Sequence, residues 1–258
     1  PQCGGKMASP LSIEINGIDP VTIAAVELII QTLPELRLRL VDSRRLSAEI
    51  VALLPEERLF PRRSQALRSH LAKHYPHLRY CSSYSPIDLG IIASVGSHDL
   101  EKADAMMHCD IPHLLTCRNE SYWDIGPLVV PGVTCCARCL ETTQSERHSL
   151  PSLGRDLELW RFETPLPWLT HMAAAWLSLM IYDFARFGMD RRSSMNRFLR
   201  ITTEGEVSWI EVDNDPLCGC TSAAVSQPPA ASLTATTLST SIGEFDMLSH
   251  NHRYRIAS

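Results

Sequence analysis

Two pairs of cysteines, far apart in the sequence, constrain the fold of this chain more than any other feature. Cys136 and Cys139 form a Cys-x-x-Cys pair near the middle, and Cys218 and Cys220 form a Cys-x-Cys pair about eighty residues later. Four thiolates complete a closed tetrahedral zinc site, with bonds of ~2.3 Å. The pattern therefore predicts a structural zinc ion that ties the second pair back onto the middle of the chain. Such a site keeps no position open for a reacting water.

The first cysteine pair leaves one alternative open. A single Cys-x-x-Cys is also typical of thiol redox sites. The second pair favours zinc, because a redox site needs only two thiols. Cys135 lies beside the first pair, and Cys136 is assigned as the ligand because it gives the two-residue spacing to Cys139.

Composition bounds the class of protein. The 258 residues are enough for one large domain with a sizeable core. A net charge of −5 without a long basic run disfavours binding to nucleic acid or to an anionic membrane. An odd count of nine cysteines and a start without a signal-peptide pattern predict reduced thiols in a cytoplasmic protein. The longest apolar run, residues 168–182, contains His171 and is short for a bilayer, so a buried helix is expected.

Strands and helices are predicted to alternate along the first half of the chain. Apolar periodicity indicates strands at residues 11–15, 36–41, 77–81, 88–94 and 113–117, and helices at residues 21–33, 64–75 and 99–109. Pro20 is placed to open the first helix, with Asp19 or Asn16 as its cap. This order predicts an α/β fold with a doubly wound, mostly parallel, Rossmann-like sheet.

The remaining segments complete the expected domain plan. Residues 168–187 form a long apolar helix, and residues 198–212 read as a hairpin with its turn at Glu204 and Gly205. We expect residues 1–10 to be an N-terminal leftover and residues 11–220 to form one α/β domain with zinc knuckles. Residues 221–258 are rich in Ser, Thr and Pro and are expected to be a disordered tail.

Several motifs resemble the ThiF/MoeB superfamily, the adenylating enzymes related to ubiquitin-activating enzymes. Residues 125–140, IGPLVVPGVTCCARCL, are similar to the family's strand, Pro-Gly turn and Cys-x-x-Cys-Leu, and residues 216–220, PLCGC, to its second knuckle. Residues 60–79 resemble the helix after the nucleotide strand. The likeness covers about residues 12–220. It is greatest to ThiF-like proteins of thiazole/oxazole-modified peptide biosynthesis, many of which bind a precursor peptide for a YcaO cyclodehydratase.

The resemblance implies an ATP site at the first strand–helix turn. Glycines there would let the backbone approach the phosphates at a helix N-terminus. In this chain Gly17 alone remains, and Asp19 and Pro20 follow it, so the turn gains a negative charge and loses an N–H donor. Asp42 falls where the family's ribose-binding acid belongs, and a strand-end cap is the other interpretation of this residue.

Two further family positions are replaced. Gln65 stands where the family has its phosphate-binding lysine, with Arg62 and Arg63 nearby as misregistered substitutes. After the fourth strand, where the family has an aspartate for Mg²⁺, the nearest acid is Asp99. Three changes together favour a pseudoenzyme that keeps the scaffold and the zinc and has lost ATP. Gly17 and Asp42 are then remnants of the nucleotide site.

These observations lead to one preferred function and two alternatives. We expect a cytoplasmic, non-catalytic ThiF-like protein that binds a precursor (leader) peptide, a YcaO-type enzyme or both, and the resemblance implies a homodimer. The first alternative is an active ATP-dependent adenylyltransferase acting on a peptide or carrier-protein C-terminus, with Cys81, Cys109 or Cys117 as an acceptor thiol. For Cys109 and Cys117 a buried, inert role is preferred. The second alternative, a zinc-ribbon nucleic-acid binder, is disfavoured by the acidic charge.

Two arginine doublets belong to neither the zinc motif nor the turn. Arg44 with Arg45, and Arg62 with Arg63, are interpreted as solvated faces, and binding of an acidic peptide is the other interpretation.

Overall fold

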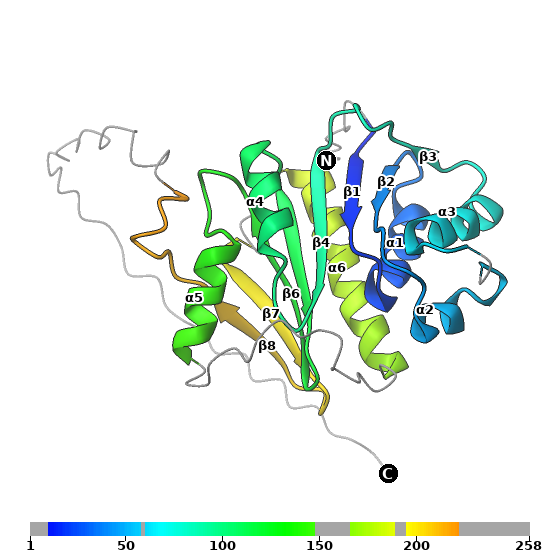
Figure 1. Ribbon diagram of the computed structural model, residues 1–258. Helices are drawn as coiled ribbons and strands as arrows, with labels where there is room; N and C mark the ends of the chain where they lie inside the picture. Colours follow the sequence, from blue (N-terminus) through cyan, green and yellow to red (C-terminus); the bar gives the residue numbers. More distant parts are fainter. Residues whose placement is uncertain (1–9, 58–59, 148–165, 189–194, 222–258) are drawn as a thin grey trace, which may run out of the picture. The chain divides into compact units, whose positions relative to one another are not determined.

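An eight-stranded sheet lies at the centre of the fold (Figure 1). The computed structural model describes residues 10–57, 60–147, 166–188 and 195–221. The strands follow the order β3-β2-β1-β4-β5-β6-β7-β8 across the sheet. They are β1 (Ser12–Asn16), β2 (Arg37–Val41), β3 (Arg79–Tyr80), β4 (Leu89–Val95), β5 (His113–Arg118), β6 (Tyr122–Val129), β7 (Arg197–Thr202) and β8 (Val207–Glu211). The predicted tail, apart from Thr221, lies outside the described residues.

The sheet has a parallel half and an antiparallel half. The pairs from β3 through β2, β1 and β4 to β5 are parallel. The pairs from β5 through β6 and β7 to β8 are antiparallel. The order reverses direction between β1 and β4, which is the switch point where open α/β sheets bind ligands. The predicted Rossmann-like α/β fold is therefore confirmed.

Helices cover both faces of the sheet. They are α1 (Pro20–Thr32), α2 (Ala48–Leu53), α3 (Arg63–His74), α4 (Leu100–His108), α5 (Ala137–Arg147) and α6 (Pro167–Phe187), with a 3₁₀ turn at Pro55–Glu57. Alternate residues of β4 divide the core: Ile91 belongs to the apolar cluster that includes α1 and α6, and Ile92 to the cluster that includes α4 and α5. In Figure 1, α4 and α5 lie in front of the sheet and α6 behind it.

The first helix forms as its sequence predicts. Asp19 is the N-cap, Pro20 occupies the first turn, where its missing N–H costs nothing, and the helix buries an apolar face that includes Val26 and Ile30. That face packs along α6, whose Ser178 Oγ donates a hydrogen bond to the Ala25 carbonyl at 3.2 Å. Among the described residues, no helix is both long and apolar enough to cross a membrane.

The structure differs from the sequence-based prediction in three elements. Strand β3 is two residues long instead of five, because it pairs only with β2 at the edge of the sheet. Helix α2 was not predicted, since it has six residues and buries only Ile50. Helix α5 was also missed, because the sequence Ala137–Arg147 is largely polar and carries little helical periodicity.

Candidate functional site

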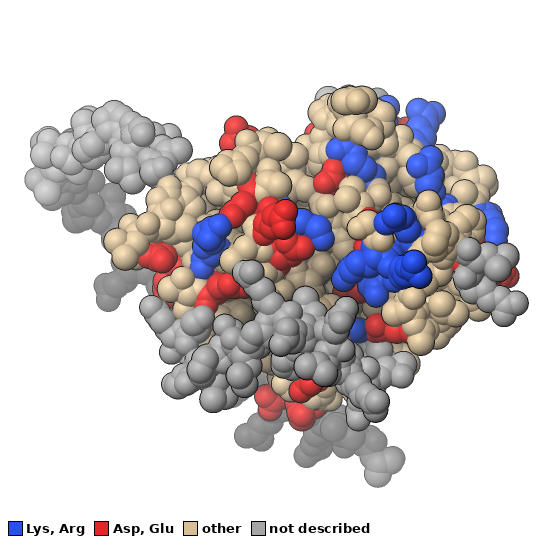
Figure 2. Space-filling view, in the orientation of Figure 1, with Lys and Arg blue, Asp and Glu red and all other residues tan. Residues whose placement is uncertain are grey.

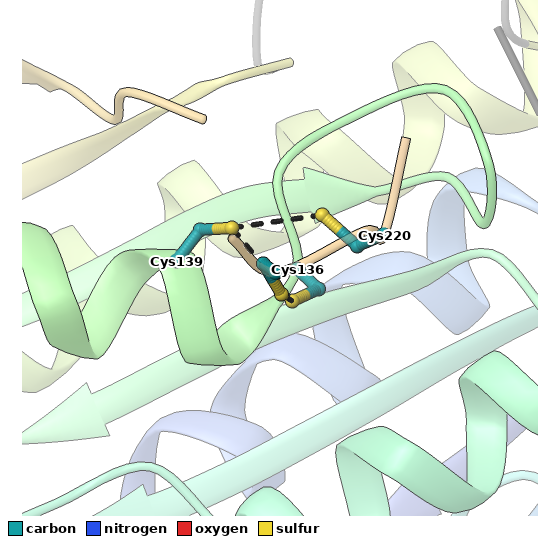
Figure 3. A group of neighbouring side chains, drawn as sticks. Cys136, Cys139 and Cys220 are labelled. Atoms are coloured by element: carbon teal, nitrogen blue, oxygen red, sulfur yellow. Dashed lines mark hydrogen bonds between the residues drawn. The ribbon is translucent and has the colours of Figure 1, made fainter. Parts of the chain in front are cut away.

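Four cysteine sulfurs gather where α5 begins and the chain leaves β8. Cys136 and Cys139 come from the start of α5, and Cys218 and Cys220 follow β8; the four Sγ atoms lie within 4.8 Å of one another. The sulfur atoms are 3.4 Å apart between Cys136 and Cys218, 3.5 Å between Cys139 and Cys220, and 3.9 Å between Cys136 and Cys139. Figure 3 shows the Cys139 and Cys220 sulfurs pointing toward each other.

This arrangement fits a tetrahedral metal ion. Four sulfurs bound at ~2.3 Å lie about 3.8 Å apart along each edge of the tetrahedron, close to the sulfur separations observed. The predicted clustering of the two pairs is thus what the structure shows, and the four cysteines are able to bind a metal. Soft thiolate ligands in this number suit Zn²⁺.

The electrostatics of the cluster call for a cation. Burial, and then the neighbouring thiols of Cys136 and Cys139, raise the pKa of Cys218 to about 11. Burial likewise raises the pKa of Cys220. For Cys139, burial opposes ionisation, but hydrogen bonds from the backbone at Asp215 and from the Cys220 thiol lower its pKa overall. Without a cation, most of these thiols therefore stay protonated. A divalent ion would stabilise the negative charge of four thiolates.

Cys135 is not part of this cluster. Its thiol donates to the Val212 carbonyl at 3.2 Å and to Asn214 Oδ1 at 2.8 Å. Burial raises its pKa to about 12. Cys135 therefore fastens the segment after β8 beside the four-cysteine cluster, and it lies outside the group of thiols that could hold a metal ion.

The first strand–helix turn lies at the carboxyl end of β1. Gly17 has φ = +97°, and a Cβ placed there would lie 2.4 Å from the Ala93 carbonyl oxygen of β4. Its N–H donates to the Val41 carbonyl at 3.1 Å. Close packing against two neighbouring strands is sufficient to require glycine here, so Gly17 by itself does not indicate a nucleotide site.

The N-terminus of α1 carries a carboxylate from the chain itself. The Thr22 N–H donates to Asp19 Oδ1 at 2.8 Å, and the Asp19 N–H donates to Thr22 Oγ1 at 2.9 Å, so the two residues form a capping box. Both side chains are buried. In nucleotide-binding α/β folds, a helix N-terminus at this position receives a phosphate.

Asp42 is engaged on both carboxylate oxygens. Its Oδ2 accepts the Ile18 N–H at 2.7 Å and lies 2.8 Å from Arg44 Nη2, and its Oδ1 accepts Arg44 Nε at 3.0 Å. Burial works to raise the pKa of Asp42, but the hydrogen bonds and charge of Arg44 and the Ile18 N–H lower it overall. Arg44 was missed as a partner, although its position two residues after a strand-end aspartate was visible in the sequence.

A second buried ion pair lies on the antiparallel side of the sheet. Asp124 and Arg200 are direct neighbours in β6 and β7, and Arg200 Nε and Nη2 each lie 2.8 Å from an Asp124 oxygen. His98, after β4, is 6% exposed, and neither ring nitrogen has a hydrogen-bond partner among the described residues. Burial, and then the charge of Arg200, lower the pKa of His98 to about 4. The sequence indicated neither the pair nor the burial of this histidine.

The remaining residues discussed from the sequence take no part in either site described above. Asp99 caps α4 through the Lys102 N–H at 3.1 Å, and Gln65 is exposed in the first turn of α3. Cys117 is buried, and burial raises its pKa, so an inert role fits. The expectation of burial was wrong for Cys109, which is exposed at the end of α4.

Comparison with known proteins gives a fold-level relationship. No protein-family model and no curated protein sequence matches the chain. Among solved structures, E. coli MccB with MccA is similar over 83% of this chain and 67% of that chain, with 14% identity and a TM-score of 0.61. The microcin C7 biosynthetic enzyme MccB with N-formylated MccA is similar over 82% and 67%, with 14% identity and a TM-score of 0.59. PaaA is similar over 80% and 74%, with 14% identity and a TM-score of 0.55.

These similarities define the class of fold. At 14% identity they show that this chain has the fold of MccB and PaaA. The chain spans about two thirds of the length of MccB. E. coli MccB has also been solved with ATP.

Proposed function

We propose that this chain is a non-catalytic ThiF-like protein that binds a precursor peptide during peptide-modification biosynthesis. The fold is shared with MccB, a microcin C7 biosynthetic enzyme solved in complex with N-formylated MccA. The proposed lack of catalysis rests mainly on the Asp19 carboxylate. This carboxylate accepts the Thr22 N–H at the N-terminus of α1. A phosphate at that point would meet a negative charge, and at ~4 Å two like charges repel by roughly 4 kcal/mol at an effective dielectric of about 20.

A second contact supports the same proposal. The Asp42 carboxylate is occupied by Arg44 and by the Ile18 N–H, so a ribose hydroxyl would have to compete with a charged hydrogen bond. The four cysteines hold a structural Zn²⁺ that joins the segment after β8 to α5. Since such a site is closed, the metal stabilises the fold and takes no part in a reaction.

The partners follow from the sequence resemblance. We propose a leader peptide and a YcaO-type cyclodehydratase as partners, a homodimer formed through the sheet domain, and a cytoplasmic location. The test uses a displayed library of random peptides, selected on the immobilised zinc-loaded protein without nucleotide. Enriched peptides should bind in solution, and mass spectrometry should find no adenylated peptide after incubation with Mg²⁺–ATP. Failure to enrich any peptide would contradict the binding function, and an adenylated product would contradict the non-catalytic one.

One alternative has a specific observation in its favour. MccB, which has been solved with ATP, shares this fold, so an active adenylyltransferase is the second candidate. It requires Asp19 and Arg44 to leave their present partners when nucleotide binds.

A further inference from the structure

Four arginines gather beside the carboxyl end of β2. The backbones of Arg45 and Arg62 form an antiparallel bridge, and the Arg63 N–H donates to the Arg44 carbonyl at 3.0 Å. The loop after β2 and the start of α3 are thereby fixed side by side. Figure 2 shows blue side chains gathered on this face, in the region of α2 and α3 in Figure 1. We name Arg44, Arg45, Arg62 and Arg63 the arginine cluster.

Two side chains of the cluster, Arg62 and Arg63, are held in place by backbone carbonyls. Arg62 Nη1 donates to the Ser43 carbonyl at 2.8 Å, and Arg63 donates to the Arg45 and Ile18 carbonyls at 3.1 and 2.9 Å. A solvated arginine usually samples many rotamers, and fixing it has an entropic cost. In this chain the hydrogen bonds to carbonyls already fix the two side chains. The remaining N–H donors of their guanidinium groups are therefore held in defined positions, where a ligand can accept hydrogen bonds from them.

The positive charge of the cluster is compensated only in part, by the nearby carboxylates of Asp42 and Asp19. Arg44 pairs with Asp42, whereas Arg45, Arg62 and Arg63 form no ion pair among the described residues. The nearby Glu49 is paired with Arg118. Burial, and then the charge of Arg44, lower the pKa of Arg63. A chain with a net charge of −5 thus holds an excess of positive charge at one end of its parallel strands.

The surroundings favour a peptide over a nucleotide. Phe60 is 38% exposed and lies two residues before Arg62, and Val41, at the end of β2, is 39% exposed. A mixed apolar and basic surface suits the side chains of a peptide, and guanidinium groups bind carboxylates in the bidentate mode. At the adjoining turn, the Asp42 and Asp19 carboxylates already accept the Ile18 and Thr22 N–H groups, so these amides are not free to bind a phosphate.

We infer that the arginine cluster binds a glutamate- or aspartate-rich segment of the partner peptide. This inference rests on the proposed peptide-binding function and narrows its substrate to an acidic class. The cluster would form salt bridges with the carboxylates, while Phe60 contacts the apolar side chains between them.

The test measures fluorescence anisotropy of a labelled glutamate-rich peptide and of its glutamine counterpart on the zinc-loaded full chain. The glutamate peptide should bind, and its affinity should fall as salt rises above physiological strength. The double variant Arg45→Ala, Arg62→Ala should weaken binding by about tenfold or more. The matched control is Arg37→Ala, Arg79→Ala, which removes the same charge from two paired residues at the amino ends of β2 and β3, and it should bind as the wild type does.

Several results would overturn the inference. If the wild type binds the glutamine peptide as tightly as the glutamate peptide, the preference for acidic peptides is refuted, but peptide binding itself is not. This comparison needs no variant. Equal loss in both double variants would show an effect of net charge alone. Stronger binding of a single-stranded oligonucleotide or of ATP would assign the cluster to phosphate. By contrast, a failure of the library selection described above would remove the proposed function itself.

Discussion

The Asp19 carboxylate accepts the Thr22 N–H at 2.8 Å, at the point where the first helix of this sheet begins. The contact satisfies one of the free amides of the helix N-terminus. It also places a negative charge at the position where nucleotide-binding α/β folds hold a phosphate. One local interaction thus stabilises the fold and supports the proposed loss of ATP.

Replacement of Asp19 tests the capping role. Asp19→Ala removes the acceptor for Thr22, so the free energy of unfolding should fall by about 1 kcal/mol, within the usual 0.5–2 kcal/mol range for a lost N-cap. Urea unfolding followed by circular dichroism measures the change. Asp19→Asn keeps an acceptor and should recover most of the stability; an unchanged stability in Asp19→Ala would refute the capping role.

Replacement of a metal-site cysteine tests the zinc assignment. Cys139→Ser should release the metal and lower the free energy of unfolding by several kcal/mol, because metal binding and folding are coupled at structural sites. Metal content by atomic emission and thermal unfolding measure the two effects. Cys109→Ser changes an exposed thiol outside the cluster and serves as the control. A Cys139→Ser protein that is as stable as the wild type and free of zinc would contradict a structural metal.

Replacement of Gly17 tests whether packing explains this residue. In Gly17→Ala the new Cβ would meet the Ala93 oxygen at 2.4 Å with φ at +97°, so strain and overpacking together should cost roughly 3–5 kcal/mol. Gly188→Ala is the control: φ is +57° and no atom lies within 4 Å of the added Cβ, so it should cost roughly 1–2 kcal/mol. If the two variants lose the same free energy of unfolding, the close approach of Gly17 to β4 does not explain the need for glycine.

The buried His98 predicts a dependence of stability on pH. Its folded pKa of about 4 lies below the ordinary histidine value of 6.5, because the side chain is buried and Arg200 is nearby. The unfolded chain therefore binds the proton more readily, and the stability present above pH 6.5 is lost as the pH falls toward 4. Between about pH 7.5 and 5 the loss should be roughly 2 kcal/mol.

The variant His98→Leu isolates this contribution. Unfolding of the wild type and of the variant at both pH values gives a double difference, in which the titration of the cysteines and carboxylates cancels. The wild type should lose roughly 2 kcal/mol more than the variant. If both lose the same amount, His98 does not control the acid sensitivity.

The parallel half of the fold could be predicted from the sequence, and parts of the antiparallel half could not. Strands buried on both faces, such as Leu89–Val95, appear as apolar runs, and Asp19 with Pro20 marks a helix start. Helix α5 could not be predicted, because its sequence is largely polar and its packing depends on distant parts of the chain: Cys139 and Leu140 are buried, and the helix contacts α4. For this helix, the residue pattern along the sequence therefore indicates the structure less well than the contacts with distant residues do.

The candidate site shows the same division. Cysteine spacing predicted which thiols come together, because metal ligands recur at fixed short intervals. The pairing of Asp42 with Arg44 and of Asp124 with Arg200 depends on side-chain direction and strand register, which a single sequence does not determine. Gly17 was expected to be a remnant of the nucleotide site, which stays a prediction; its close approach to Ala93 is an additional packing constraint that periodicity does not reveal.

The central claim, that this chain keeps the fold of an adenylating enzyme without its nucleotide chemistry, is tested most directly by calorimetric titration of the zinc-loaded protein with Mg²⁺–ATP, with pyrophosphate exchange measured on the same sample. Because Asp19 and Arg44 hold the turn, we predict no binding heat up to millimolar nucleotide and no exchange. Saturable binding accompanied by pyrophosphate exchange would contradict the account and identify the chain as an active adenylyltransferase.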